Sequence, residues 1–200
     1  MVGAEQVQVR RVRLGSVLNA SAAVLPLVLA VASVFLPLWY FQFNAPFLGQ
    51  RWPEVTIYPL EGIKGAVQDV NVINHYVGLS MIGNEYVPEV SYLPHFYAAV
   101  IAVTAVYSFS ALTRRRGAAL ASLVVMAALI VVLFVFVYFW LYRFTHTIHP
   151  DAPIKIEPFD PPFLGEHKIA NIVVRSYFGP SIGLHIAAVA IGFVSMKRMR

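Results

Sequence analysis

Residues 123–140 read LVVMAALIVVLFVFVYFW and contain no charged side chain. The surrounding segment, 118–142, exceeds the roughly 20 apolar residues that a helix needs to cross the hydrocarbon core of a bilayer. The whole chain is similar, since 58% of its 200 residues are hydrophobic, 12% are charged, and the mean hydropathy is +0.68. In soluble domains about a quarter of the residues are charged. The composition therefore predicts an integral membrane protein.

Three more apolar segments predict spans at 17–40, 94–112 and 179–196. The first follows three arginines, as the apolar region of a signal peptide would, but it is longer than the roughly 7 to 15 residues of such a region. We therefore interpret it as an uncleaved anchor. The expected fold class is an all-α membrane protein, a single domain over residues 1–200 with four transmembrane helices. Its two long loops, 41–93 and 143–178, are expected to form a small mixed extracytoplasmic cap.

The charges are distributed asymmetrically along the chain. Nine of the fifteen basic residues lie in the two terminal tails and the Arg114–Arg116 turn, whereas nine of the ten acidic residues lie in the two long loops. Cytoplasmic segments of membrane proteins are enriched in Lys and Arg. The pattern predicts a multi-pass protein of the cytoplasmic membrane with both termini in the cytoplasm and both loops outside. Because the basic residues flank spans, we expect a lipid bilayer as the partner and no nucleic acid.

Small residues recur at every fourth position of the last predicted span. They are Gly179, Gly183 and Ala187, with Ala188 and Gly192 repeating the spacing. Such residues let helix backbones approach closely. The contact is expected within the four-helix bundle or, alternatively, with another subunit.

The first loop contains a segment, 66–77, with helical spacing of its apolar residues. A helix there would have an apolar face of Ala66, Val70, Ile73 and Val77 and a polar face of Gln68, Asn71 and His75. Such a helix suits a membrane surface, although VQDVNV also keeps the alternation of a strand. Upstream, EVTIYPLEGI at 54–63 predicts a short strand and a turn.

The second loop is rich in proline. Five prolines lie between His149 and Pro162, and they favour an extended course over a helix. The sequence ANIVVRSYF at 170–178 predicts a strand that pairs with part of the first loop. The two loops would then be held together by strand pairing.

All six histidines fall in the outer half of the predicted topology, at positions 75, 95, 146, 149, 167 and 185. Each one alone suits a hydrogen-bonded interfacial role. Together they allow a metal site, because copper accepts imidazole ligands. The candidates are His75, His146 and His149, although Pro150 disfavours helical geometry at His149. Haem would need two axial histidines that face each other across helices, and only His95 and His185 lie within predicted spans.

Other kinds of chemistry are disfavoured. The chain has no cysteine, which excludes thiolate metal sites and disulfides. The predicted spans contain no Asp, Glu, Lys or Arg, the residues that usually mark an ion or proton path. No pattern predicts a nucleophile with its base, a phosphate-binding glycine loop or a zincin site. We therefore expect no enzymatic activity.

Three short motifs resemble a known family. NHYVGL at 74–79, HPDAPIKIEPFDPPFLG at 149–165 and PLW at the end of the first span resemble sequences of small uncharacterised four-span membrane proteins. These proteins are encoded among the nitrous oxide reductase assembly (nos) genes of some bacteria and archaea. The resemblance implies an accessory role near an extracytoplasmic copper enzyme.

The functional expectation combines these observations. We expect a non-catalytic integral membrane accessory or structural subunit that supports maturation or electron supply of an extracytoplasmic copper enzyme. Its partners would be other membrane or extracytoplasmic subunits. The alternative is a haem- or copper-binding electron-transfer protein. The polar residues Asn74, His75 and Tyr76 are expected to tie the first loop to the second, where Asp151, Lys155 or backbone groups offer partners.

Overall fold

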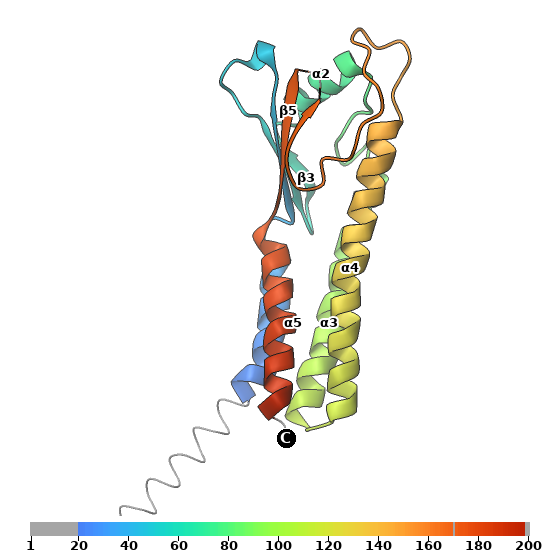
Figure 1. The fold of residues 1–200 in the computed structure, drawn as a ribbon. Coiled ribbons are helices and arrows are strands. Elements are labelled where there is room, and N and C mark those ends of the chain that lie inside the picture. The colour runs from blue at the N-terminus through green and yellow to red at the C-terminus, as the bar shows by residue number, and fades with distance from the viewer. Residues whose placement is uncertain (1–19, 170, 199–200) are drawn as a thin grey trace, which may run out of the picture.

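The computed structural model describes residues 20–169 and 171–198. Three of its helices are long and apolar enough to cross a membrane, and they comprise Pro88–Leu112, Arg116–His146 and Pro180–Lys197. A shorter apolar helix, Ala20–Ser33, lies beside them. The predicted first span, 17–40, begins outside the described residues. Figure 1 shows these helices as one bundle, with a sheet and a further helix gathered at one end.

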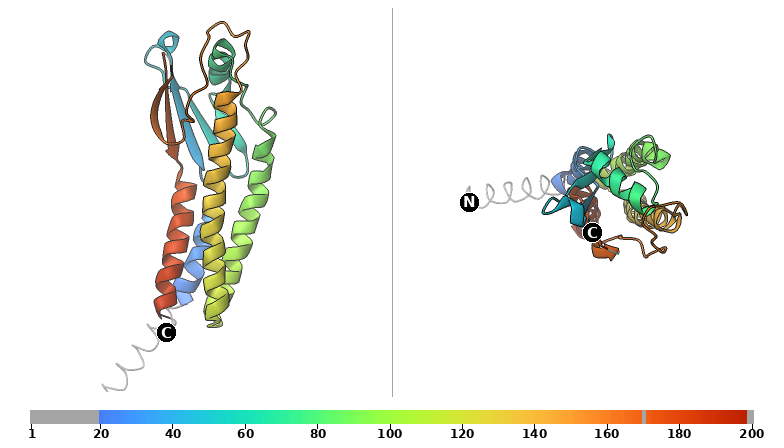
Figure 2. Two further views of the ribbon diagram at one scale, coloured as in Figure 1. Left: turned by 45° about the vertical axis from the view of Figure 1, so that its right-hand side comes forward. Right: turned by 90° about the horizontal axis from the view of Figure 1, so that it is seen from above.

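The bundle contains α3 (Leu93–Leu112), α4 (Arg116–His146) and α5 (Pro180–Arg198). A short 3₁₀ helix, η2 (Pro88–Tyr92), leads into α3. The turn between α3 and α4 lies at the end of the bundle opposite the sheet, and the left view of Figure 2 shows the same arrangement. The helix α4 continues past its neighbours and reaches the level of the sheet.

The expected all-α fold class is wrong, because the chain also forms a five-stranded antiparallel sheet with the order β3-β2-β1-β5-β4. The strands are β1 (Trp39–Asn44), β2 (Glu54–Tyr58), β3 (Gly62–Gly65), β4 (Gly165–Ile169) and β5 (Ile172–Phe178). The cap expected from the two loops is therefore built around a sheet to which both loops contribute.

The predicted end of the first span at residue 40 is also wrong. The helix ends at Ser33, and Trp39 begins β1. Pro37 cannot donate a helical hydrogen bond and restricts the residue before it, which ends the helix. The following residues alternate, with Trp39 and Phe41 buried and Tyr40 less so. Because the apolar residues continue without a break, the sequence does not show where the helical spacing of buried residues gives way to the alternation of a strand.

Two strand predictions are confirmed. The predicted strand at 170–178 is β5 over Ile172–Phe178, and it pairs with β1 along its length. The predicted strand and turn at 54–63 form β2 and the start of β3, a hairpin that pairs Tyr58 with Gly62. The chain thus joins its two loops through the central pair of the sheet.

The segment after Gly65 forms α2 (Val67–Val77), as predicted. Its apolar face is confirmed, because Val70, Ile73 and Val77 are buried. The prediction for Asn71 is wrong, because this side chain is buried with the apolar face. Val70 packs in the cluster that contains the inner side chains of the sheet. The helix therefore covers the sheet, where a helix lying on a membrane surface was expected.

One apolar cluster joins the cap to the bundle. It includes Trp39 and Phe41 of the sheet, Val70 of α2, and Leu133 and Leu141 of α4. The indole ring of Trp39 is fully buried and contacts the rings of Phe134, Phe163 and Phe178. Because buried side chains run without interruption from the sheet into the helices, the cap and the bundle share a core.

The small residues predicted to repeat along the last span, Gly179 and those within α5, have different surroundings. A Cβ placed on Gly179 would overlap the backbone of Pro37, and one on Gly192 would overlap the side chain of Leu123 in α4. These two glycines therefore serve close packing within the chain. A Cβ on Gly183 would meet nothing within 4 Å.

Candidate functional site

The two loops meet through the backbone beside the NHY triplet. The carbonyl oxygen of Tyr76 accepts a hydrogen bond from the backbone nitrogen of Ile154 at 2.9 Å, and that of Gly78 accepts from His149 at 2.8 Å. Gly78 ends α2 in the left-handed conformation, with φ of 79°. This turn aims the carbonyl groups at the proline-rich loop. The expected tie between the loops is therefore made by backbone groups.

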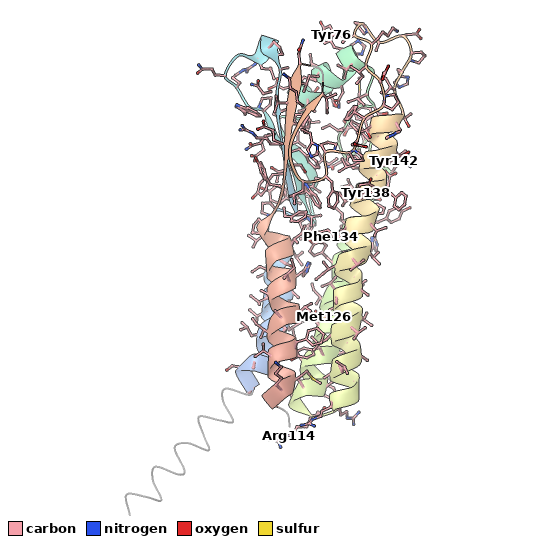
Figure 3. The ribbon with its side chains drawn as sticks, viewed as in Figure 1. Tyr76, Arg114, Met126, Phe134, Tyr138 and Tyr142 are labelled. Carbon is pink, nitrogen blue, oxygen red and sulfur yellow. The ribbon has the colours of Figure 1, made fainter. Side chains whose placement is uncertain are left out.

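The side chains of the triplet have separate roles. Asn74 is buried, and its Nδ2 donates to the carbonyl oxygen of Ser80 at 3.1 Å. His75 is exposed, and no hydrogen bond joins its side chain to the described part of the chain; its ring lies 6.2 Å from that of Tyr76. Tyr76 is 47% exposed at the end of the molecule farthest from Arg114 (Figure 3).

Among the described residues, no hydrogen bond or ion pair joins the side chains of Asp151 or Lys155 to the triplet. Lys155 donates its Nζ to the carbonyl oxygen of Pro150 within its own loop. Asp151 is exposed. The loop contributes its backbone at His149 and Ile154.

Asn71 is the polar contact that the sequence analysis missed. Its Nδ2 donates to the carbonyl oxygen of Ile82 at 2.8 Å, and its Oδ1 accepts from the backbone nitrogen of Ile82 at 2.8 Å. One buried amide thus satisfies both backbone groups of a residue in the segment that follows α2. The NxxN spacing of Asn71 and Asn74 was the available signal, because it places both amides on one side of a helix.

The two histidines proposed as haem ligands lie in different surroundings. His185 is buried in the bundle, where its Nε2 lies 2.9 Å from Ser33 Oγ and its ring lies 5.1 Å from that of Tyr97. Since Ser33 Oγ donates to the carbonyl oxygen of Ala30, it accepts from His185 Nε2. His95 precedes Tyr97 by two residues, which places it about 200° around α3. Its exposed ring bonds the carbonyl oxygen of Ser91.

His146 and His167 bond nearby carbonyl groups. His146 ends α4, where its Nδ1 lies 2.9 Å from the carbonyl oxygen of Tyr142 and its ring stacks on that tyrosine. The helix stops before His149, in agreement with the effect expected of Pro150. His167 lies 3.0 Å from the carbonyl oxygen of Leu164. Within residues 20–169 and 171–198, no three His, Asp or Glu side chains gather as a metal site would require.

Hollows lie where the cap meets α4. An apolar cavity of about 60 Å³ lies between the sheet, α2 and the proline-rich loop, and Trp140, Leu141 and Phe144 of α4 contribute to its wall. A second hollow of about 180 Å³ is partly polar. It contains the ion pair of Arg143 with Glu89, which joins the outer end of α4 to η2.

Comparison with known proteins finds no matching family model, curated protein or solved structure. The resemblance to the membrane proteins of nitrous oxide reductase assembly therefore remains a prediction.

Proposed function

We propose that the protein is a four-span component of the cytoplasmic membrane with both termini in the cytoplasm and the sheet outside. Arg114 of the basic turn lies at one end of the bundle, and the two loops, whose sequences carry nine of the ten acidic residues, extend at the other end (Figure 3). This separation supports the orientation, because basic residues accumulate on the cytoplasmic side. The fourth proposed span contains the apolar helix Ala20–Ser33, which ends before β1 begins at Trp39.

Its function, in this proposal, is that of a non-catalytic accessory subunit that holds a rigid cap above the membrane for an extracytoplasmic partner. The direct connection between helices and sheet carries this proposal. β1 follows the first helix after five residues, and β5 passes into α5 through Gly179 alone. Both connections lead to the centre of the sheet. Such a cap moves little relative to the bundle and suits a docking role.

The partner proposed is an extracytoplasmic copper enzyme, which the family resemblance implies. A subunit that supports its maturation or electron supply needs a fixed position at the membrane surface. The exposed outer side chains of β4 and β5, among them Lys168 and Tyr177, offer one face of the cap for such contact.

A deletion strain tests the proposed function. In a host that encodes this protein beside a nitrous oxide reductase, we expect deletion to lower the copper content or activity of that enzyme while its polypeptide is still exported. The wild-type chain should restore it, and so should a triple variant carrying His75→Ala, His146→Ala and His149→Ala. An unaffected reductase would contradict the accessory role. Rescue by the wild-type chain alone would favour the copper-binding alternative.

A further inference from the structure

The cleft between the outer end of α4 and η2 has the composition of an amphipathic binding site. Its volume is about 180 Å³, and its wall combines Arg143 and Glu89 with the aromatic side chains of Tyr86, Trp140 and Phe144. Both charged residues lie at the ends of segments long and apolar enough to span a membrane. In the membrane placement proposed above, the cleft faces the outer surface of the bilayer.

The ion pair in the cleft is incompletely satisfied. Arg143 Nη2 donates to Glu89 Oε1, but the Arg143 side chain is 66% exposed and a guanidinium has five N–H donors. Its remaining donors suit a phosphate, which arginine binds through two parallel hydrogen bonds. The second carboxylate oxygen, Glu89 Oε2, is buried and has no hydrogen-bond partner among the described residues.

An unpaired buried carboxylate oxygen costs free energy unless a donor reaches it. The terminal torsion of a glutamate is soft, so the carboxylate of Glu89 can rotate at little cost to present an oxygen to the cleft that it lines. A primary ammonium would then satisfy it, and the rings of Tyr86, Trp140 and Phe144 suit a cation as neighbours. The charges of Glu89 and Arg143 thus complement an ammonium and a phosphate a few ångströms apart.

An apolar cavity adjoins the cleft and shares Val87, Glu89 and Trp140 with it. Its volume is about 40 Å³, and it is also lined by Ile57 and Ile63 of the sheet, Leu93 of α3 and Phe136 of α4. The two hollows together have a charged end and an apolar end. This is the arrangement that a lipid requires and that a small soluble zwitterion does not.

We propose that the cleft binds one phospholipid whose headgroup ends in a primary ammonium. The phosphate lies on Arg143, the ammonium on Glu89, and an acyl chain enters the apolar cavity beside Phe136. The proposal rests on the membrane placement proposed above. It does not depend on the identity of the partner protein.

Lipid binding to the purified, delipidated full-length protein tests the proposal by native mass spectrometry. Phosphatidylethanolamine, phosphatidylcholine and diacylglycerol with identical chains are compared. Phosphatidylcholine lacks N–H donors, and diacylglycerol lacks the phosphate. We expect one phosphatidylethanolamine to bind at least about tenfold more tightly than either of the others, as loss of a charge-assisted hydrogen bond implies. Equal affinities for the three lipids would overturn the proposal.

Three variants assign the roles within the cleft. Arg143→Gln should weaken phosphatidylethanolamine binding at least about tenfold, and Glu89→Gln should abolish the preference over phosphatidylcholine. Arg175→Gln is the matched control, because Arg175 pairs with Glu166 in the cap outside the cleft. An equal loss in this control, or unchanged binding in Arg143→Gln, would contradict the site.

Two further measurements keep the result interpretable. If Arg143→Gln does not fold, Arg143→Lys replaces it, and we expect weaker binding because an ammonium cannot hold a phosphate through two parallel bonds. Binding by Arg143→Lys as tight as the wild type would then contradict the site. Soluble phosphoethanolamine at equal concentration should not displace the lipid, and full displacement would overturn the role of the apolar cavity. Membrane insertion of the variants is measured separately. A protein that does not insert would contradict the proposed membrane placement, whereas an inserted protein that binds no lipid would contradict only the lipid site.

Discussion

The backbone nitrogen of Gly179 donates a hydrogen bond to the carbonyl oxygen of Leu38 at 2.8 Å, which joins the end of β5 to the residue before β1. Two residues further on, the nitrogen of Ser181 donates to the carbonyl oxygen of Pro37 at 3.0 Å. These bonds lie where both central strands of the sheet turn into helices. The joint between cap and bundle is therefore made of backbone groups and depends on the absence of a side chain at Gly179.

Gly179→Ala tests this joint. The added methyl group would overlap the backbone of Pro37, which cannot move without disturbing β1. We expect a loss of about 1 to 3 kcal/mol in the free energy of unfolding, as for other overpacking substitutions. Gly183→Ala lies inside α5 with open space around it and should not lower the free energy of unfolding. Thermal unfolding in detergent measures both, and equal effects would contradict the close contact at Gly179.

Asn71→Ala should loosen the segment that follows α2. The change removes both hydrogen bonds to Ile82 and leaves a buried N–H and C=O without partners. We expect a cost of about 2 to 3 kcal/mol and faster proteolysis between residues 78 and 87. Gln68→Ala, at an exposed position of the same helix, serves as the control. A cleavage rate equal to that of the wild type would show that other contacts hold this segment.

Ser176→Ala should lower the stability of the cap by removing a buried hydrogen-bond partner. Ser176 Oγ accepts a hydrogen bond from Trp39 Nε1 at 2.7 Å and donates one to the carbonyl oxygen of Phe163 at 2.9 Å. Without the hydroxyl, the buried indole N–H has no partner. We expect a cost of about 1 to 3 kcal/mol, measured as a lower unfolding temperature together with a shift in tryptophan fluorescence. An unchanged unfolding temperature would contradict this role.

His75→Ala should change stability by less than about 0.5 kcal/mol, as is usual for an exposed side chain. The neighbouring substitution Asn74→Ala should cost more, since Asn74 is buried and bonds the carbonyl oxygen of Ser80. Thermal unfolding of the two variants gives the comparison. A large loss of stability in His75→Ala alone, reproduced in the parent protein by removing metal, would favour the ligand role considered from the sequence.

The sequence predicted those features that depend on local pattern. The helical spacing of Val70, Ile73 and Val77 identified α2, and the β-rich run at 170–178 identified the strand that joins the two loops. Both patterns arise because one face of the segment is buried, so they can be recognised in the sequence without knowing which helix or strand covers that face.

Features that depend on tertiary context were missed. Trp39 and Tyr40 extend an apolar run and were assigned to a span, because hydrophobicity alone does not distinguish the end of a helix from a buried strand. Asn71 was assigned to the polar face, since its burial depends on the backbone of Ile82 returning to meet it. The cleft at Arg143 was not visible either, because its partner Glu89 lies 54 positions away.

The orientation of the bundle in the membrane is the central claim, and labelling of single cysteines tests it most directly. The chain has no cysteine, so each introduced thiol is unique. Lys168→Cys lies on the exposed strand β4, and Arg115→Cys lies at the turn between α3 and α4. In intact cells, a membrane-impermeant maleimide should label Lys168→Cys alone, and Arg115→Cys should react only after permeabilisation. Labelling of both positions in intact cells, or of Arg115→Cys alone, would contradict the account.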